Sequence, residues 1–256
     1  MSIFEFTVSP YQKIPEKLLD AYTMQGKVPI FDLYFDGTKK NVVMWSNELI
    51  NDYCKRFTPK NIRKSEEGSS TYGHHVCVNL LDSFEKYDIR NKNVAVVGSE
   101  TPWIEAMLIN LNNKVTTIDY NVPVSNYNNL DCKDYFNFFE NNRDTFEAIV
   151  SFSSIEHSGL GRYGDPLDPD GDIKTMRVIH NNLKNDGILI WGAPVGKDAL
   201  VWNAHRVYGE IRLPFVFENY EEIEWFGASK DYLFNFPLAN WGSQPVVVLK
   251  KSNVNI

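Results

Sequence analysis

A polar, turn-rich segment directly follows an apolar run and contains the side chains best suited to catalysis. Residues 146–150 have the composition of a buried strand, and residues 151–172 read SFSSIEHSGLGRYGDPLDPDGD. A general base that removes a hydroxyl proton needs a pKa near the working pH, which histidine has. We therefore predict an active-site loop in which His157 is the base and Glu156 orients it or binds the substrate.

The same loop also has a structural interpretation. Glu156 could cap a helix, and His157 could hydrogen-bond to a turn. Four carboxylates follow, at Asp165, Asp168, Asp170 and Asp172. Counted from Asp168, the sixth and twelfth positions are isoleucines, where an EF-hand needs Gly and Glu. We therefore expect turn and capping roles for these carboxylates and no metal site, with Mg²⁺ on a sugar diol as an alternative.

A second polar cluster, WNAHRVYGEIRL at residues 202–213, follows the next apolar run. His205 is a rival base, and the guanidinium of Arg206 could bind a carboxylate or diol of the substrate in a forked geometry. In the first loop, the candidate substrate-binding residues are Arg162, Tyr163 and Asp165. Each of these side chains could instead have a purely structural partner.

A glycine and an aspartate occupy positions suited to nucleoside binding. Gly98 ends the apolar run 93–97 just before a helical pattern, where free backbone N–H groups face a ligand. Asp119 ends the following strand, where a carboxylate can accept hydrogen bonds from ribose hydroxyls. Residues 98–103 read GSETPW and lack two glycines of the dinucleotide fingerprint G-x-G-x-x-G, which disfavours NAD.

Strands and helices alternate from residue 74 onward. Helical spacing is found at 74–87, 101–113 (with Thr101 as N-cap) and 171–187, and apolar strand patterns at 93–98, 114–119, 146–152 and 187–194. This alternation predicts a doubly wound, mostly parallel α/β sheet. Two last strands, at 223–229 and 245–251, have no evident helix between them, so we expect an antiparallel final strand.

The first 70 residues have a different pattern. Residues 30–45 suggest a hairpin that turns at Asp36 and Gly37, and residues 64–73 form the clearest loop. We therefore expect an N-terminal extension or cap over residues 1–70 and a main domain over residues 71–256.

Composition restricts the class of partner. The net charge is −7 without a cluster of basic residues, so nucleic acid is not an expected partner. The three cysteines lack metal-site or disulfide spacing, as expected in a reducing compartment. No apolar run approaches the ~20 residues that span a bilayer, and the start shows no signal-peptide pattern. We expect a cytoplasmic protein without membrane contact.

Three stretches resemble a known family: VVGSETPWIEAM, SSIEHSGLGRYGDPLDPDGD and WNAHRVYGEIRL. They are similar to the domain-of-unknown-function 268 family, over roughly residues 70 to 250. That family resembles class I S-adenosylmethionine (SAM)-dependent methyltransferases and includes proteins associated with glycan or polysaccharide modification. The resemblance implies a Rossmann-like, seven-stranded sheet with an antiparallel last strand, and SAM as cofactor with S-adenosylhomocysteine (SAH) as product.

The resemblance also implies positions for the cofactor contacts. Gly98, with Ser99 beside it, would face the methionine part of SAM, and Asp119 its ribose. Further contacts would come from Tyr120 and Asn121 near the adenine, Asp131 or Cys132 in the adenine pocket, and Tyr72 and Gly73 closing over the cofactor.

These observations predict a SAM-dependent O-methyltransferase that acts on a sugar hydroxyl of a glycan, nucleotide-sugar or polysaccharide precursor. One alternative is a nicotinamide-dependent sugar oxidoreductase or epimerase, disfavoured because neither Tyr163 nor Tyr208 begins a Y-x-x-x-K motif. Another is a non-catalytic binding protein on a methyltransferase scaffold. The sequence predicts neither the acceptor in detail nor the oligomeric state.

Overall fold

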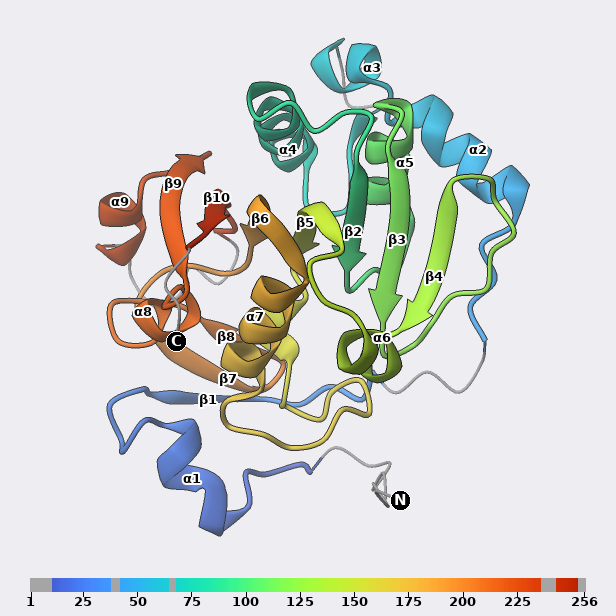
Figure 1. Ribbon diagram of the computed structural model, residues 1–256. Helices are drawn as coiled ribbons and strands as arrows, with labels where there is room; N and C mark the ends of the chain where they lie inside the picture. Colours follow the sequence, from blue (N-terminus) through green and yellow to red (C-terminus); the bar gives the residue numbers. More distant parts are fainter. Residues whose placement is uncertain (1–10, 38–41, 65–67, 236–242, 253–256) are drawn as a thin grey trace.

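A twisted seven-stranded sheet forms the centre of the molecule in the computed structural model, which describes residues 11–37, 42–64, 68–235 and 243–252 (Figure 1). Its strand order is β4-β3-β2-β5-β6-β10-β9. The strands are β2 (Asn93–Val97), β3 (Lys114–Asp119), β4 (Leu130–Asp134), β5 (Phe146–Phe152), β6 (Leu183–Gly192), β9 (Tyr220–Phe226) and β10 (Val246–Lys251). β10 runs antiparallel to both of its neighbours, β6 and β9, while the other pairs of this sheet are parallel, so the predicted fold class and antiparallel last strand are confirmed.

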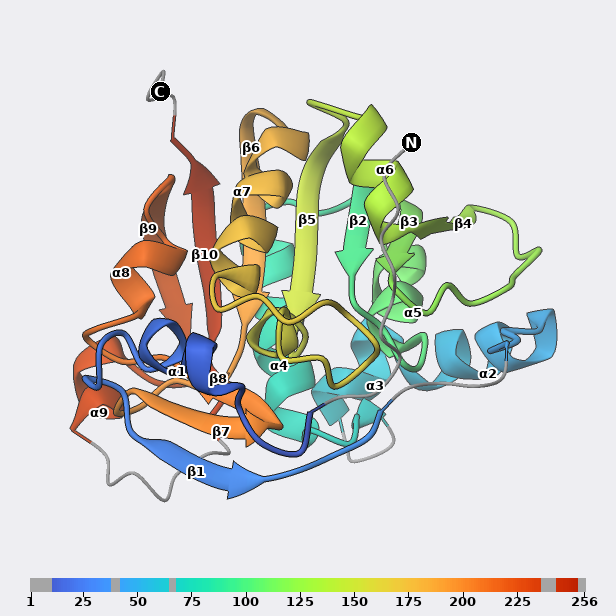
Figure 2. The same ribbon diagram turned by 90° about the horizontal axis from the view of Figure 1, so that it is seen from below.

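Helices cover both faces of this sheet, because alternate strand residues point to opposite sides. Val94 and Val96 of β2 pack in one apolar core, while Ala95 and Val97 pack in the other. The first core contains α2 (Asn47–Arg56), α3 (Pro59–Lys64), α4 (His74–Lys86) and α5 (Trp103–Asn110). The second contains α6 (Tyr135–Asn141), α7 (Gly171–Asn182), α8 (Leu213–Val216) and α9 (Lys230–Phe234). Figure 2 shows α6 and α7 together on one side of the sheet, with α4 and α5 on the other.

A second, three-stranded sheet lies beside the carboxyl ends of the main strands (Figure 2). It joins β1 (Ile30–Leu33) to β7 (Ala199–Asn203) in parallel, and β7 to β8 (His205–Val207) in antiparallel orientation. The hairpin expected at residues 30–45 is therefore wrong: β1 pairs with a strand far along the chain, and Met44 instead forms an isolated bridge with Val124. Residues 38–41 of that stretch lie outside the described residues.

The N-terminal segment, residues 11–37, contacts the loop predicted to be catalytic. Tyr22, the last residue of α1 (Glu16–Tyr22), donates a hydrogen bond of 2.5 Å to the carbonyl of Gly159. The backbone N–H of Gly37 donates to the carbonyl of Arg162 at 2.8 Å. The segment therefore packs directly on the loop, and a domain boundary at residue 70 stays a prediction.

Several element ends differ from the expectation. Helix α7 ends at Asn182, and residues 183–187 already belong to β6. Pro102 rather than Thr101 is the N-cap of α5. The connection between the last two strands contains the short helix α9, and its residues 236–242 lie outside the described residues. Among the described helices, none combines the length and apolar character needed to cross a membrane.

Candidate active site

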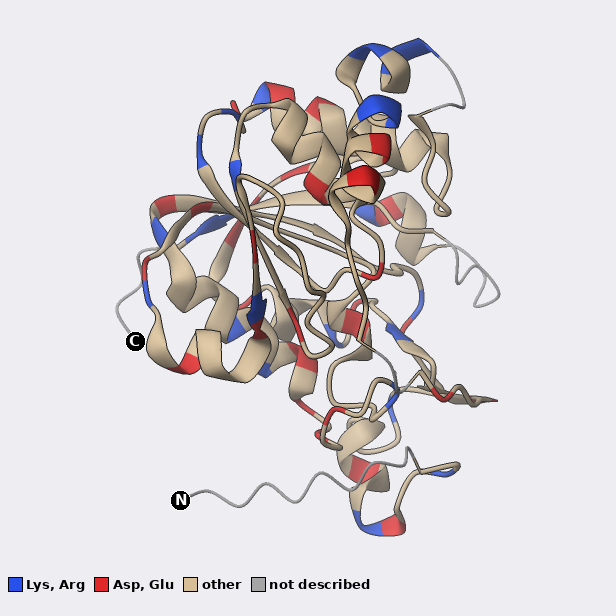
Figure 3. Cartoon of the chain, turned by 90° about the vertical axis from the view of Figure 1, so that its right-hand side faces the viewer, with Lys and Arg blue, Asp and Glu red and all other residues tan. Residues whose placement is uncertain are grey.

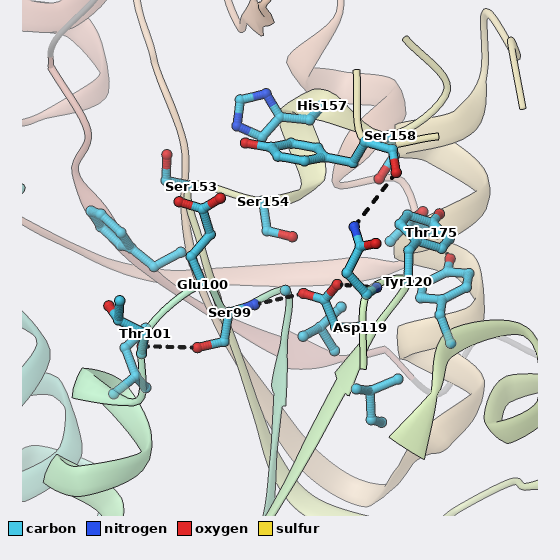
Figure 4. Close-up of a pocket in the computed structure, with 18 of the residues that line it drawn as sticks. Ser99, Glu100, Thr101, Asp119, Tyr120, Ser153, Ser154, His157, Ser158 and Thr175 are labelled. Atoms are coloured by element: carbon cyan, nitrogen blue, oxygen red, sulfur yellow. Dashed lines mark hydrogen bonds between the residues drawn. The ribbon is translucent and has the colours of Figure 1, made fainter. Parts of the chain in front are cut away.

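A pocket opens at the carboxyl ends of β2, β3 and β5 (Figure 4). In an open parallel sheet this edge is the usual ligand site. The lining residues from these strand ends and from the loop after β5 include Gly98, Ser99, Glu100, Asp119, Tyr120, Asn121, Ser153, Ser154, His157, Ser158, Tyr163 and Asp165. Tyr72, Trp103 and Phe152 add an aromatic wall, in which the rings of Tyr72 and Phe152 meet edge to face at 5.2 Å.

The carboxylate of Asp119 is fixed between two strand-end loops. Its Oδ2 accepts a hydrogen bond from the backbone N–H of Ser99 at 2.9 Å, and its Oδ1 accepts from that of Asn121 at 2.7 Å (Figure 4). Each carboxylate oxygen can accept more than one hydrogen bond, so both can still accept from a diol. The geometry suits the ribose contact that the sequence predicted.

Gly98 is required by the backbone around it. Its φ of +78° is unfavourable for residues with a side chain, and a Cβ there would lie 1.8 Å from Oγ of Ser154. The turn after β2 is therefore packed against the turn after β5. Ser153 has a φ of +51°, although it is not a glycine, which is a strained conformation that concentrates at functional sites.

His157 lies in the pocket wall as a neutral imidazole (Figure 4). Its Nδ1 is 2.5 Å from the carbonyl oxygen of Ala204, which can only accept, so Nδ1 carries the proton and Nε2 is a hydrogen-bond acceptor. Burial, assisted by the charge of Arg162, lowers the pKa of His157 to about 3. The expectation that it titrates near neutral pH is wrong, because the sequence does not show how deeply the loop buries the ring.

Glu156 lies behind the pocket wall rather than in it. The side chain is fully buried, and its Oε1 accepts a hydrogen bond of 3.0 Å from Oγ of Ser153. Oε1 is also 3.7 Å from Nε2 of His157. Burial raises the pKa of Glu156 to about 7. The carboxyl therefore contacts the predicted base and a pocket-lining hydroxyl at once.

Asp165 organises the backbone of the loop. Its carboxylate accepts hydrogen bonds from the backbone N–H groups of Gly159 at 2.7 Å, and of Gly161 and Tyr163 at 3.2 Å each. Asp168 pairs with Lys174 at 2.6 Å. Within the described residues, no three His, Cys, Asp or Glu side chains are grouped to hold a metal ion.

Arg206 supports the loop from behind. It is 3% exposed, and its guanidinium donates to the carbonyl oxygens of Ser158 at 2.7 Å and Pro169 at 3.2 Å. The expectation that Arg206 binds substrate is therefore wrong, because its donors point to backbone of the loop. Arg162, another predicted substrate contact, has its guanidinium between the rings of Phe35 and Tyr163 and donates to the carbonyl of Ala204.

A buried ionic cluster anchors the end of the loop. Asp172 lies inside α7 rather than before it, is fully buried, and pairs with Arg212 at 2.5 Å and Arg206 at 3.6 Å. Burial opposes its ionisation, but the charges of Arg206 and Arg212 outweigh that effect and lower the pKa of Asp172. The helix-capping role expected for Asp172 is therefore wrong.

The remaining predicted residues lie outside the pocket wall. Asp131 and Cys132 are on the edge strand β4, and Gly73 is the N-cap of α4, next to the pocket-lining Tyr72. His205 is on β8, with its ring centre 6.5 Å from that of His157. Burial and the charge of Arg162 lower the pKa of His205 to about 4.

Several pocket residues are not predictable from the motifs of the sequence. Ser153 and Ser154 follow β5 directly, and their position at a strand end was a usable signal. Tyr135 and Thr175 come from α6 and α7 and share a hydrogen bond of 2.9 Å. Nothing in their sequence surroundings indicates a pocket, because the packing of two helices brings them there.

The comparisons with known proteins agree with this architecture. A family model described as "Caenorhabditis protein of unknown function, DUF268" matches residues 91–252. The chain belongs to this DUF268 family. Among curated proteins, a search found no match.

Similarity to one solved structure shows the fold. The Burkholderia thailandensis 1,6-didemethyltoxoflavin-N1-methyltransferase, with bound 1,6-didemethyltoxoflavin and SAH, is 12% identical over 80% of this chain and 86% of its own, with a TM-score of 0.52. A TehB-like SAM-dependent methyltransferase from Corynebacterium glutamicum is 16% identical over 79% of this chain and 98% of its own, with a TM-score of 0.43. This DUF268 chain has the class I methyltransferase fold, as the resemblance implied.

The buried cluster gives a first prediction. Asp172→Asn leaves two buried arginine charges without their partner and should lower the free energy of unfolding by about 3–5 kcal/mol. The exposed pair of Asp168 and Lys174 provides a matched control. Asp168→Asn should lower the free energy of unfolding by only about 0–1 kcal/mol. Urea denaturation measures both. Equal losses would show that Asp172 does not anchor the fold.

The pKa of Asp172 also sets a pH window. Because its folded-state pKa is lowered, its stabilisation is present above the unfolded value near 3.9 and is lost as the pH falls through the folded value. The difference in stability between the native protein and Asp172→Asn should therefore shrink only in strongly acidic solution.

The hydrogen bonds of Asp165 give a second prediction. Since this carboxylate already holds three backbone N–H groups, we expect it to shape the loop without a metal ion. Excess EDTA or Mg²⁺ should leave the thermal transition of the protein unchanged. A Mg²⁺-dependent rise that is lost in Asp165→Asn would place a metal ion at this carboxylate instead.

Proposed function

We propose that the protein is a SAM-dependent methyltransferase. The observation that carries the proposal is the carboxylate of Asp119, held between the backbone of Ser99 and Asn121 beside the Gly98 turn. Asp119 would hold the ribose hydroxyls, and the ring of Tyr120 and the side chain of Asn121 would lie near the adenine. SAM, when bound, supplies an electrophilic methyl group.

A nicotinamide cofactor fits the first turn less well. Its pyrophosphate requires close backbone approach at a second glycine, and residues 99–103 contain none. SAM has no pyrophosphate, so one glycine turn suffices.

For the acceptor we propose a sugar hydroxyl. Aromatic faces are suited to sugar rings, and Tyr72 and Tyr163 line the pocket together with His157. The resemblance to proteins of glycan modification supports the same class. The acceptor atom does not follow from the fold, since the Burkholderia enzyme is named as an N1-methyltransferase.

The chain's own groups would position the acceptor and its proton. The Nδ1–H of His157 is held by the carbonyl of Ala204, which turns the unprotonated Nε2 into a fixed acceptor in the pocket wall. An acceptor hydroxyl bonded to Nε2 would present its oxygen in a defined direction, and such positioning contributes much of the rate of a transfer reaction. The buried loop around it would exclude water.

Cofactor identity can be tested by thermal shift with SAM, SAH, NAD and NADP. SAH at 100 times its Kd should stabilise the folded protein by ~2.7 kcal/mol. Asp119→Ala should weaken SAH binding by roughly 1–3 kcal/mol, measured by calorimetry, because the ribose hydroxyls lose their acceptor. Stabilisation by NADH together with no effect of SAH would contradict the proposal.

His157 can be tested through transfer of labelled methyl from SAM to a panel of uncharged oligosaccharides. His157→Gln should lower kcat by about 10²-fold with little change in SAM affinity, because a misplaced acceptor costs roughly that much in rate. His205→Ala serves as the contrast and should stay within a few-fold of native. Because the pKa of His157 is about 3, its protonation should not reduce kcat between about pH 5 and pH 8 at saturating SAM. SAM binding without transfer to any oligosaccharide would favour another acceptor class or a binding protein.

A further inference from the structure

Glu156 is a buried carboxyl directly connected to the pocket. Its Oε1 accepts from the pocket-lining hydroxyl of Ser153, and its Oε2 has no hydrogen-bond partner among the described residues. Full burial without a bound cation is costly for an ionised carboxylate. The site therefore contains an acid that has no ion pair with a lysine or arginine among the described residues.

The nearby cations are committed to other groups. Arg206 binds loop carbonyls and pairs with Asp172. Arg162 donates to the carbonyl of Ala204 and stacks between two aromatic rings. Neither guanidinium makes a hydrogen bond to the carboxyl of Glu156. The charge of Arg162, whose Nε has no hydrogen-bond partner among the described residues, partly offsets the effect of burial on the pKa of Glu156, but a cation in the pocket would not have to displace an arginine ion pair.

Other titratable and charged groups lie on the elements around Glu156, which are its own turn, the loop after it, β8, α7 and the opposite pocket wall. They are His157, Arg162, Tyr163, His205, Arg206, Tyr208, Asp172, Tyr72 and Glu100. Burial keeps both histidines neutral by lowering their pKa values to about 3 and 4, and it keeps the tyrosines neutral by raising theirs. Burial raises the pKa of Glu156 to about 7, so its charge can change near neutral pH.

We propose that Glu156 is the counter-charge of the sulfonium group: its carboxyl is ionised when SAM fills the pocket and protonated when neutral SAH replaces it. This inference rests on the proposed function. If Asp119 holds the ribose at the end of β3, the methionine part of the cofactor would lie beside Gly98, which packs against the turn of Ser153 and Ser154 at the end of β5. The positive sulfur would then be on the side of the pocket where the hydroxyl of Ser153 is bonded to Glu156.

The charge of the sulfonium group determines how SAM binding and the ionisation of Glu156 affect one another. A nearby positive charge favours the ionised carboxylate and lowers its pKa, so SAM binding should release a proton near pH 7. SAM affinity should then rise with pH through the pKa of the free protein, by at most tenfold per pH unit. SAH carries the same amino and carboxylate groups without the sulfonium charge, so the ratio of the two Kd values isolates the effect of the sulfur.

The experiment is calorimetric titration of SAM and of SAH from mildly acidic to mildly alkaline pH. In the native protein, the Kd of SAH divided by the Kd of SAM should rise roughly 3- to 10-fold between about pH 6 and pH 8. Titrations in buffers of different ionisation enthalpy should show proton release with SAM and little with SAH. In Glu156→Gln the ratio should not change with pH, while SAH binding shows that the pocket is folded.

Two further variants sharpen the test. Ser153→Ala keeps the carboxyl of Glu156 but removes the hydrogen bond that favours its ionised form. The rise in the ratio of the SAH Kd to the SAM Kd should therefore move to higher pH. Glu105 is also fully buried, its pKa is raised by burial to about 7, and its Oε2 also has no hydrogen-bond partner among the described residues. Its carboxyl accepts from Thr117 between α5 and β3 and lies near Ser99 and Asp119, on the proposed ribose side of the pocket and away from Ser153. Glu105→Gln should therefore leave the pH dependence of this Kd ratio unchanged.

The outcomes separate the two proposals. Binding of both ligands with a pH-independent ratio in the native protein, or a rise that persists in Glu156→Gln, would overturn the counter-charge role and leave the methyltransferase proposal intact. If Glu156→Gln does not fold, the counter-charge role would be overturned by a Ser153→Ala variant in which the Kd ratio rises at the same pH as in the native protein. Failure of both SAM and SAH to bind would overturn the proposed function, and this inference with it.

Discussion

The buried carboxylate of Asp172 is the interaction on which the site depends. Two arginines and the hydroxyl of Tyr208 surround it, at the start of α7 and the end of the loop that follows β5. Arg206 and Arg212 then extend to loop carbonyls, including that of Pro169. One ionic group thus joins α7, β8 and the loop, and a loop of glycines and prolines acquires a defined conformation.

The pocket combines this rigid loop with the edge of the sheet. Parallel strands deliver Gly98, Asp119 and Ser153 to one side, and the close approach of Gly98 to Ser154 fixes the distance between two strand ends. Charges are placed unevenly around the pocket (Figure 3 shows their distribution over the chain): carboxylates line it or lie just behind it, while Arg162 and Arg206 are held by the loop. A cationic ligand is favoured by such an arrangement.

Much of this architecture could be predicted from the sequence, because strands buried on both faces are nearly continuous apolar runs. The runs at 93–98, 114–119 and 146–152 became β2, β3 and β5, and Gly98, Asp119 and His157 line the pocket at or after the ends of these strands. Burial could not be predicted: Arg206 and Asp172 look like surface residues, and the shifted pKa of His157 depends on the residues packed around it. The pairing of β1 with β7 was also hidden, since strand partners distant in sequence leave no local pattern.

The pairing of β1 with β7 has a consequence for synthesis on the ribosome. Phe35 exchanges hydrogen bonds with the side chain of Asn203, a residue 168 positions later. The chain emerges from its N-terminus, so β1 must wait until most of the protein has been translated before its partner exists. The contacts of the N-terminal segment with the loop after β5, where Phe35 lies over Arg162 and Gly37 meets Tyr163, are therefore not anchored until β7 has been made. A partly translated chain can contain β2 and β3 while the strand that holds β1 in place is still missing.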